Sequence, residues 1–260
     1  ENSVRVTGTM NTHFDSIEVN GLQVSISGWS SSFGITIPIV LGENVIVVTG
    51  KSENGTVIHE KTITVFRYPS NYLYVDPNGD DANAGNGPGV NALRTISAAV
   101  AKAVDGDVIN IAAGTYTENL GISKSITLLG ESGSNRPIIK PRTDINALIY
   151  VTKYGWGTVS VEFENLILDG SGKNVVNALR FYSGTVGSIK NCEIKNIRYQ
   201  QFVGYGIYAY SAQVSVTDTV MQNIESVGCY ANNSSSMTIK NLQYTGKGAG
   251  SNHWDFAVYT

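Results

Sequence analysis

The chain repeats one element four times: FENLIL at residues 163–168, IKNCEI at 189–194, VTDTVM at 216–221 and IKNLQY at 239–244. Successive copies begin 26, 27 and 23 residues apart. That much chain makes one turn of a β-helix with three short strands, in which each turn contacts only its neighbours. The repeat therefore predicts a parallel β-helix.

The third position of this element is always Asn or Asp: Asn165, Asn191, Asp218 and Asn241. Both residue types tolerate a tight backbone bend and bond to their own backbone. Stacked turns would bring the four side chains together as a ladder of hydrogen bonds. We expect them to be structural.

A second element lies between the copies of the first: NALIY at 146–150, NALRFY at 177–182, YGIYAY at 205–210, VGCYAN at 227–232 and FAVYT at 256–260. Alternate side chains of a strand face opposite ways. The column expected to point inward comprises Leu148, Leu179, Ile207, Cys229 and Val258. The neighbouring outward column comprises Ile149, Arg180, Tyr208, Tyr230 and Tyr259. A second outward column, two residues on, comprises Val151, Tyr182, Tyr210 and Asn232.

The tyrosines of these outward columns form the candidate contact face. Successive rungs of a parallel sheet lie about 4.8 Å apart, so the rings should form a flat strip edged by phenol groups. The residues expected on it are Arg180, Tyr182, Tyr208, Tyr210, Tyr230 and Tyr259. Such a strip suits pyranose rings, and it also suits a protein partner. Alternatively, the tyrosines only cover one another across the rungs.

Residues 1–68 follow a different pattern. Short alternating runs predict strands, and Asn20-Gly21 is a strong hairpin signal. Short strands at this spacing favour a β-sandwich. The segments LGENVIVV at 41–48 and KTITV at 61–65 resemble the bacterial immunoglobulin-like modules appended to many secreted enzymes and surface proteins.

The opening of the repeat region carries a second resemblance. YVD at 74–76, NGD at 78–80, LRTI at 93–96, GD at 106–107 and AGTYTE at 113–118 resemble the start of pectin-lyase-like right-handed parallel β-helix proteins. The resemblance implies that the helix expected at 95–104 caps the N-terminal end of the solenoid. We therefore expect an all-β chain: an immunoglobulin-like β-sandwich at 1–68 and a right-handed parallel β-helix at 70–260 with one N-terminal capping helix.

The same resemblance bears on two candidate functions, a polysaccharide-cleaving enzyme and a non-catalytic protein. Enzymes of that superfamily act on polysaccharides, the lyases with a Lys or Arg base and calcium, the hydrolases with clustered Asp. The outward columns hold no carboxylate and one arginine, whereas acid–base catalysis needs titratable groups beside the substrate. We assign no catalytic residue and expect ion pairs across rungs between Asp169 and Lys195 and between Glu164 and Lys190. A non-catalytic extracellular or cell-surface protein for adhesion or assembly is favoured; a polysaccharide lyase or glycoside hydrolase is the alternative.

Calcium is the one cofactor that the residues suggest. Asp76, Asn78 and Asp80 have the alternating oxygen ligands of a calcium loop. The missing distal Glu and the Pro-Gly content favour a plain turn instead. Cys192 and Cys229 should lie two rungs apart, about 10 Å, which exceeds the reach of a disulfide.

Charge and hydropathy limit the partners. The net charge of -3 gives no reason to expect nucleic acid, and no apolar run approaches the roughly 20 residues of a membrane span. Polysaccharide or other copies of the chain are the expected partners. The chain stops at Thr260 inside a strand, and an uncovered strand edge is a template for pairing. This favours head-to-tail contact between copies, with the last rung as one surface.

Overall fold

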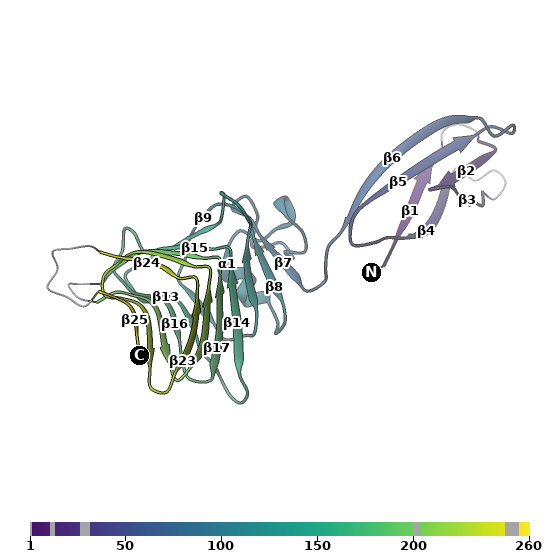
Figure 1. Cartoon of the computed structure of the whole chain (residues 1–260). Coiled ribbons are helices and arrows are strands. Elements are labelled where there is room, and N and C mark those ends of the chain that lie inside the picture. The colour runs from purple at the N-terminus through teal and green to yellow at the C-terminus, as the bar shows by residue number, and fades with distance from the viewer. Residues whose placement is uncertain (1, 11–13, 27–31, 200–202, 248–254) are drawn as a thin grey trace. The chain divides into compact units, whose positions relative to one another are not determined.

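The computed structural model describes residues 2–10, 14–26, 32–199, 203–247 and 255–260 (Figure 1). The protein is all-β, and it divides into unit 1, Glu1–Pro69, and unit 2, Ser70–Thr260. Among the described residues, no helix has the length and apolar character needed to cross a bilayer.

Unit 1 contains two antiparallel sheets. The first pairs β1 (Ser3–Thr9) with β4 (Ser32–Pro38). The second has the order β3 (Leu22–Val24), β2 (Ser16–Val19), β5 (Gly42–Lys51) and β6 (Val57–Arg67). Both sheets contribute to one apolar cluster, comprising Val6, Ile17, Val19, Val24, Ile37 and Ile46. The hairpin predicted at Asn20-Gly21 is confirmed: both residues have positive φ, and they join β2 to β3.

Unit 2 is a parallel β-solenoid of about five turns, as the repeat predicts. A seven-stranded sheet comprises β7 (Tyr72–Val75), β8 (Val108–Ile111), β11 (Thr127–Gly130), β14 (Val159–Glu164), β17 (Thr185–Lys190), β20 (Gln213–Thr217) and β23 (Ser236–Lys240). The ladder sheet comprises β9 (Thr115–Thr117), β12 (Ile138–Lys140), β15 (Ile167–Asp169), β18 (Glu193–Ile197), β21 (Val220–Ile224) and β24 (Gln243–Gly246). The tyrosine sheet comprises β10 (Leu120–Ile122), β13 (Ile145–Val151), β16 (Val175–Phe181), β19 (Tyr205–Tyr210), β22 (Val227–Asn232) and β25 (Phe256–Tyr259).

Each full turn supplies one strand to each sheet, and inward apolar side chains form one continuous core. Phe163 and Phe181 are fully buried there and meet edge to face. Cys192 and Cys229 are free and buried, as expected. Burial raises the pKa of the Cys192 thiol to about 11 and that of Cys229 to about 12, so both remain protonated at neutral pH.

The predicted Asn ladder is confirmed for two pairs of its four side chains. Asn165, Asn191, Asp218 and Asn241 have φ of 60°, 50°, 49° and 54°, the left-handed region in which Asn and Asp are enriched. They connect strands of the seven-stranded sheet to the ladder sheet. Asn191 donates from Nδ2 to Oδ1 of Asn165 at 2.8 Å, and Asn241 donates likewise to Asp218 at 2.7 Å.

The α-helix α1 (Ile96–Lys102) is tied to the first turns at both ends, and a short 3₁₀ helix η1 (Gly89–Asn91) precedes it. Glu118 accepts hydrogen bonds from the backbone N–H of Ile96 and Ser97. Lys124 donates to the carbonyls of Val100 and Ala101. A carboxylate at the N-terminus and an ammonium group at the C-terminus both complement the helix dipole.

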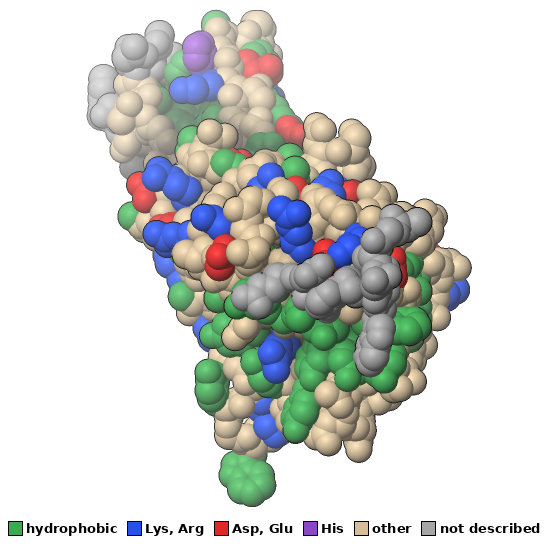
Figure 2. All heavy atoms as spheres, turned by 90° about the vertical axis from the view of Figure 1, so that its left-hand side faces the viewer, with side chains coloured by type: hydrophobic (Ala, Val, Ile, Leu, Met, Phe, Trp, Pro, Cys, Tyr) green, Lys and Arg blue, Asp and Glu red, His purple; other side chains and the backbone are tan. Residues whose placement is uncertain are grey.

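The last turn is the least covered part of unit 2. β25 lies at the edge of the tyrosine sheet, and Val258 is 42% exposed. Val258 keeps the predicted inward register beside Cys229, but it is not buried with the rest of the column, because no described strand pairs with the outer side of β25. Figure 2 shows hydrophobic side chains gathered on this face. Contact between copies here stays a prediction.

The ladder generates a stability prediction. Replacing Asn191 by Ala should lower the free energy of unfolding by about 2 kcal/mol, through the lost hydrogen bond and the strain of a left-handed residue. Replacing it by Gly should cost about half as much, because Gly accepts positive φ. Urea unfolding followed by circular dichroism would test this. Equal losses for Ala and Gly would contradict a conformational role.

Candidate functional site: the tyrosine face

The outward column of the tyrosine sheet is set by strand register. Tyr150 pairs with Arg180, Arg180 with Tyr208, Tyr208 with Tyr230, and Tyr230 with Tyr259. We call this column, together with Tyr182, Tyr205 and Tyr210, the tyrosine face.

The sequence prediction of this column was correct except in its first rung. Leu179, Ile207 and Cys229 are fully buried, as expected. However, Leu179 pairs with Ile149, so Tyr150, not Ile149, continues the outward column. Val151 is buried and does not join the second outward column. The sequence alone places the first rung one residue off, because β13 carries adjacent apolar residues that satisfy either register.

The rings do not form the flat strip that the sequence suggested. The ring centroids of Tyr208 and Tyr230 lie 5.1 Å apart with an interplanar angle of 86°. Tyr230 and Tyr259 repeat this geometry at 5.1 Å and 85°. Aromatic pairs at rung spacing favour edge-to-face contact over parallel stacking. The face therefore presents alternating ring edges and ring faces.

Arg180 lies between two rings of the face. Its guanidinium carbon is 4.9 Å from the ring centroid of Tyr182 and 5.0 Å from that of Tyr208. Its Nε is buried without a hydrogen-bond partner, and no carboxylate of the described residues pairs with it. The Nε donor of Arg180 is thus unused within the described part of the chain, and its burial keeps it away from solvent.

Neutral polar groups complete the face. Asn232 donates from Nδ2 to the phenol oxygen of Tyr208 at 2.9 Å, which fixes that ring. Burial raises the pKa of Tyr205, and the neighbouring phenols of Tyr230 and Tyr208 raise it further. The Tyr205 phenol therefore stays neutral in ordinary buffers and can act as a hydrogen-bond donor.

The loop between β13 and β14 adds two aromatic side chains that the sequence analysis missed. Tyr154 is 76% exposed, and Trp156 is fully exposed. Gly155 and Gly157 flank the tryptophan with φ of 81° and 93°, which few other residues adopt. The GWG pattern between two strands was the available signal.

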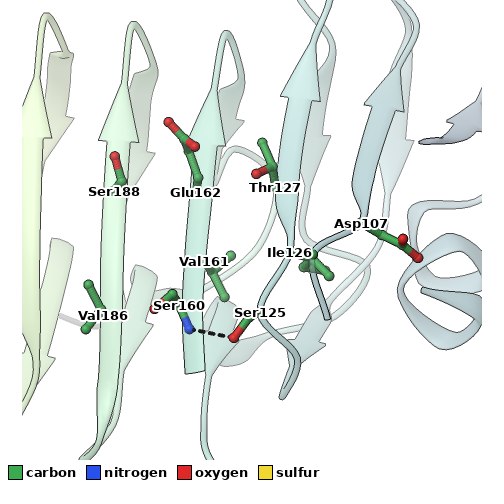
Figure 3. Close-up of a pocket in the computed structure, with 10 residues that line it drawn as sticks. Asp107, Ser125, Ile126, Thr127, Ser160, Val161, Glu162, Val186 and Ser188 are labelled. Carbon is green, nitrogen blue, oxygen red and sulfur yellow. Dashed lines mark hydrogen bonds between the residues drawn. The ribbon is translucent and has the colours of Figure 1, made fainter. Parts of the chain in front are cut away.

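A hollow on the seven-stranded sheet is a second candidate site (Figure 3). It has a volume of about 290 Å³ and is lined by the hydroxyls of Ser125, Thr127, Ser160 and Ser188. Two carboxylates share its lining. The carboxylate of Asp107 accepts a hydrogen bond from the backbone N–H of Val104, whereas the carboxylate of Glu162 has no bonded partner among the described residues.

The proposed calcium ligands are engaged in turns. Asp76 accepts hydrogen bonds from the backbone and the side chain of Asn78, and Asp80 accepts one from the N–H of Ala82. Within the described residues, His, Cys, Asp and Glu side chains nowhere gather in threes around one point. The hydrogen bonds are those of a plain turn, and calcium binding stays a prediction.

The two expected ion pairs differ in outcome. Lys190 and Glu164 pair at 3.1 Å, as predicted. Asp169 and Lys195 are neighbours in register, but they do not pair with each other. Lys195 instead pairs with Glu193 at 2.8 Å.

Asp169 belongs to a second ladder of side chains. It is nearly buried, accepts a hydrogen bond from Asn196 at 2.8 Å and one from the N–H of Ser171, and lies 3.5 Å from Lys140. Asn196 in turn accepts from Asn223 at 2.8 Å. A carboxylate held in this way is structural and is not available to a substrate.

Comparisons with known proteins do not identify a function for this chain. No protein-family model matches the sequence, and no curated protein matches it. Among solved structures, the chain is similar to Dex49A from Penicillium minioluteum, with 10% identity, a TM-score of 0.19, and coverage of 93% of this chain and 70% of that chain. A likeness this weak carries no argument about function, so the assignment rests on the site itself.

Asp169 gives a prediction of pH dependence. Burial raises its pKa, but the bonds from Asn196 and Ser171 and the charge of Lys140 outweigh this and hold the pKa below 3.8. A lowered folded pKa means that the carboxylate stabilises the fold above the unfolded pKa and stops doing so as the pH falls through the folded value. Asp169→Asn should cost about 2 kcal/mol of unfolding free energy at neutral pH.

Urea unfolding of wild type and variant at a series of pH values would measure this difference. It should shrink as the pH falls below 3.8. The matched control is Glu164→Gln, which removes an exposed ion pair worth under about 1 kcal/mol. A difference between wild type and Asp169→Asn that persists unchanged in acid would contradict the assignment.

Proposed function

We propose that this protein is a non-catalytic, extracellular or cell-surface β-solenoid that binds polysaccharide through the tyrosine face. The observation that carries the proposal is the gathering of aromatic rings and one unpaired arginine on a sheet whose outward columns contain no carboxylate. Aromatic side chains offer apolar surface to the CH faces of sugar rings, and their polar atoms bond to hydroxyls. Calcium at Asp76, Asn78 and Asp80 is not needed for this role.

Side-chain exposure supports ligand contact in addition to mutual packing. Tyr208 and Tyr230 are half-buried against their neighbours, so they serve chiefly as a scaffold. Tyr150, Tyr210 and Tyr259 are exposed. Tyr154 and Trp156 lie on the loop that follows β13 of the tyrosine sheet. They are too exposed for packing against other rings to account for their presence. These exposed rings are the expected points of contact.

The rest of the chain fits a role in display. We infer that unit 1 is an immunoglobulin-like module and that α1 caps the solenoid. Modules of this kind are appended to many secreted enzymes and surface proteins, which supports an extracellular or cell-surface location.

The proposal predicts that Trp156→Ala and Tyr210→Ala each weaken binding five- to tenfold, because an aromatic contact contributes about 0.5–1.5 kcal/mol beyond its buried area. Affinity electrophoresis of the full chain in gels containing xyloglucan, mixed-linkage β-glucan or polygalacturonate would measure it. Phe66→Ala, an exposed ring of unit 1, is the control and should change nothing. Retardation that neither face variant reduces would contradict the proposal.

Hydrolysis in the hollow of the seven-stranded sheet is the second candidate. It is favoured by one observation, that Asp107 and the unpaired Glu162 line the same space. Two carboxylates beside a sugar chain are the minimum for most glycoside hydrolysis. Binding by the tyrosine face is preferred because Asp107 is held by a turn, which leaves a single free carboxylate.

The two candidates make opposite predictions about turnover. A binder releases no reducing or unsaturated ends from the same polysaccharides, with or without calcium. Turnover abolished by Glu162→Gln but retained by Glu164→Gln would assign the hollow as an active site, since Glu164 lies on the same strand but pairs with Lys190. Colorimetric detection of reducing ends and absorbance detection of unsaturated products would distinguish the outcomes.

A further inference from the structure

The two sheets of unit 1 cover each other unequally. On the second sheet, Ile46 of β5 pairs with Ile63 of β6, and Val48 pairs with Lys61. Residues directly opposite on antiparallel strands point to the same face. Ile46 is buried against the first sheet, whereas Ile63 is 36% exposed and Lys61 is exposed. The inner face of β6 therefore lacks the cover that β5 has.

A groove of about 320 Å³ lies where that cover is missing. One wall is β1, from Val6 to Thr9, and the other is the inner face of β6 with His59, Lys61 and Ile63. Phe33 and Phe14 form its apolar lining. A Cβ on Gly8 would lie 2.4 Å from the Phe33 ring, and one on Gly50 would lie 2.6 Å from the Phe14 ring, so both glycines make room for these rings.

The wall formed by β1 is a strand edge. Among the described residues, β1 pairs with β4 alone, so alternate backbone N–H and C=O groups of β1 face away from β4. An edge of this kind accepts a further strand through main-chain hydrogen bonds. A strand added beside β1 would lie over β6 and fill the groove.

The charges that line the groove determine which side chains an added strand should carry. Lys61 and His59 are its titratable lining residues, and no carboxylate is among the lining residues described. Lys61 has no ion pair within the described part of the chain. Glu60 pairs with Thr49 and so faces the opposite side of the sheet. An apolar strand with an acidic side chain opposite Lys61 would complement the groove.

We propose that unit 1 binds an extended acidic peptide segment of a partner protein, which adds as a strand beside β1. Apolar side chains at alternate positions contact Phe14, Phe33 and Ile63, and a carboxylate pairs with Lys61. An inward lysine on an edge strand can also serve only to prevent unwanted pairing. These two roles predict different binding behaviour.

The test uses the full chain and three fluorescent ten-residue peptides of alternating Val and Thr. The first carries one central Asp in the Val register, the second carries Lys at that position, and the third is the Asp peptide with alternate backbone nitrogens methylated. Fluorescence anisotropy should show the wild type binding the Asp peptide at least tenfold more tightly than either of the others. Lys61→Glu should reverse the preference between Asp and Lys peptides, and Lys61→Gln should abolish it.

Thr62→Glu is the matched control, because it places the same acidic side chain on the outer side of the same strand. It should leave the preference for the Asp peptide intact. Circular dichroism would check that each variant folds; Lys61 is exposed, so its replacement should leave the core untouched. Equal binding of the Asp and Lys peptides by the wild type, no binding of any peptide, or an equal effect of Thr62→Glu would overturn the proposal and leave Lys61 a guard against pairing.

Discussion

Parallel pairing between successive turns, at about 4.8 Å per rung, is the constraint on which the structure of unit 2 depends. Every outward side chain of an inner rung has a neighbour one rung above and one below at that spacing. Asn191 meets this constraint with a 2.8 Å hydrogen bond to Asn165. Tyr208 and Tyr230 meet this constraint with ring planes inclined at 86° to each other. The structural ladders and the candidate binding face are thus consequences of one backbone spacing.

The sequence predicts those features that repeat. Four copies of one element, each with Asn or Asp at its third position, indicate the solenoid and its ladder, because a bend that recurs in every turn needs the same residue type. Inward burial of Leu179, Ile207 and Cys229 follows from alternation alone. A feature that recurs in several copies is supported by each of them, which makes it easier to predict than a feature of one copy.

Features that occur once could not be predicted in this way. The register of β13 was ambiguous because Leu148 and Ile149 are both apolar, and only pairing with β16 selects Tyr150 for the face. Asp169 and Lys195 are neighbours in register, but each has a better partner from another position, which the sequence does not encode as a pattern. The exposure of Trp156 depends on a loop that occurs in one turn only.

The placement of carboxylates is the reason that we propose binding and not catalysis for unit 2. With 15% charged residues, the chain has few acids, and the structure uses most of those near its repeats in bonds: Glu118 at α1, Glu164 with Lys190, Asp169 in its ladder and Glu193 with Lys195. Catalysis needs titratable groups that remain free to exchange protons with a substrate. Binding needs exposed apolar surface with polar groups at its edge, and the exposed tyrosines of the tyrosine face supply both. On this ground we propose that the tyrosine face holds a sugar chain and does not cleave it.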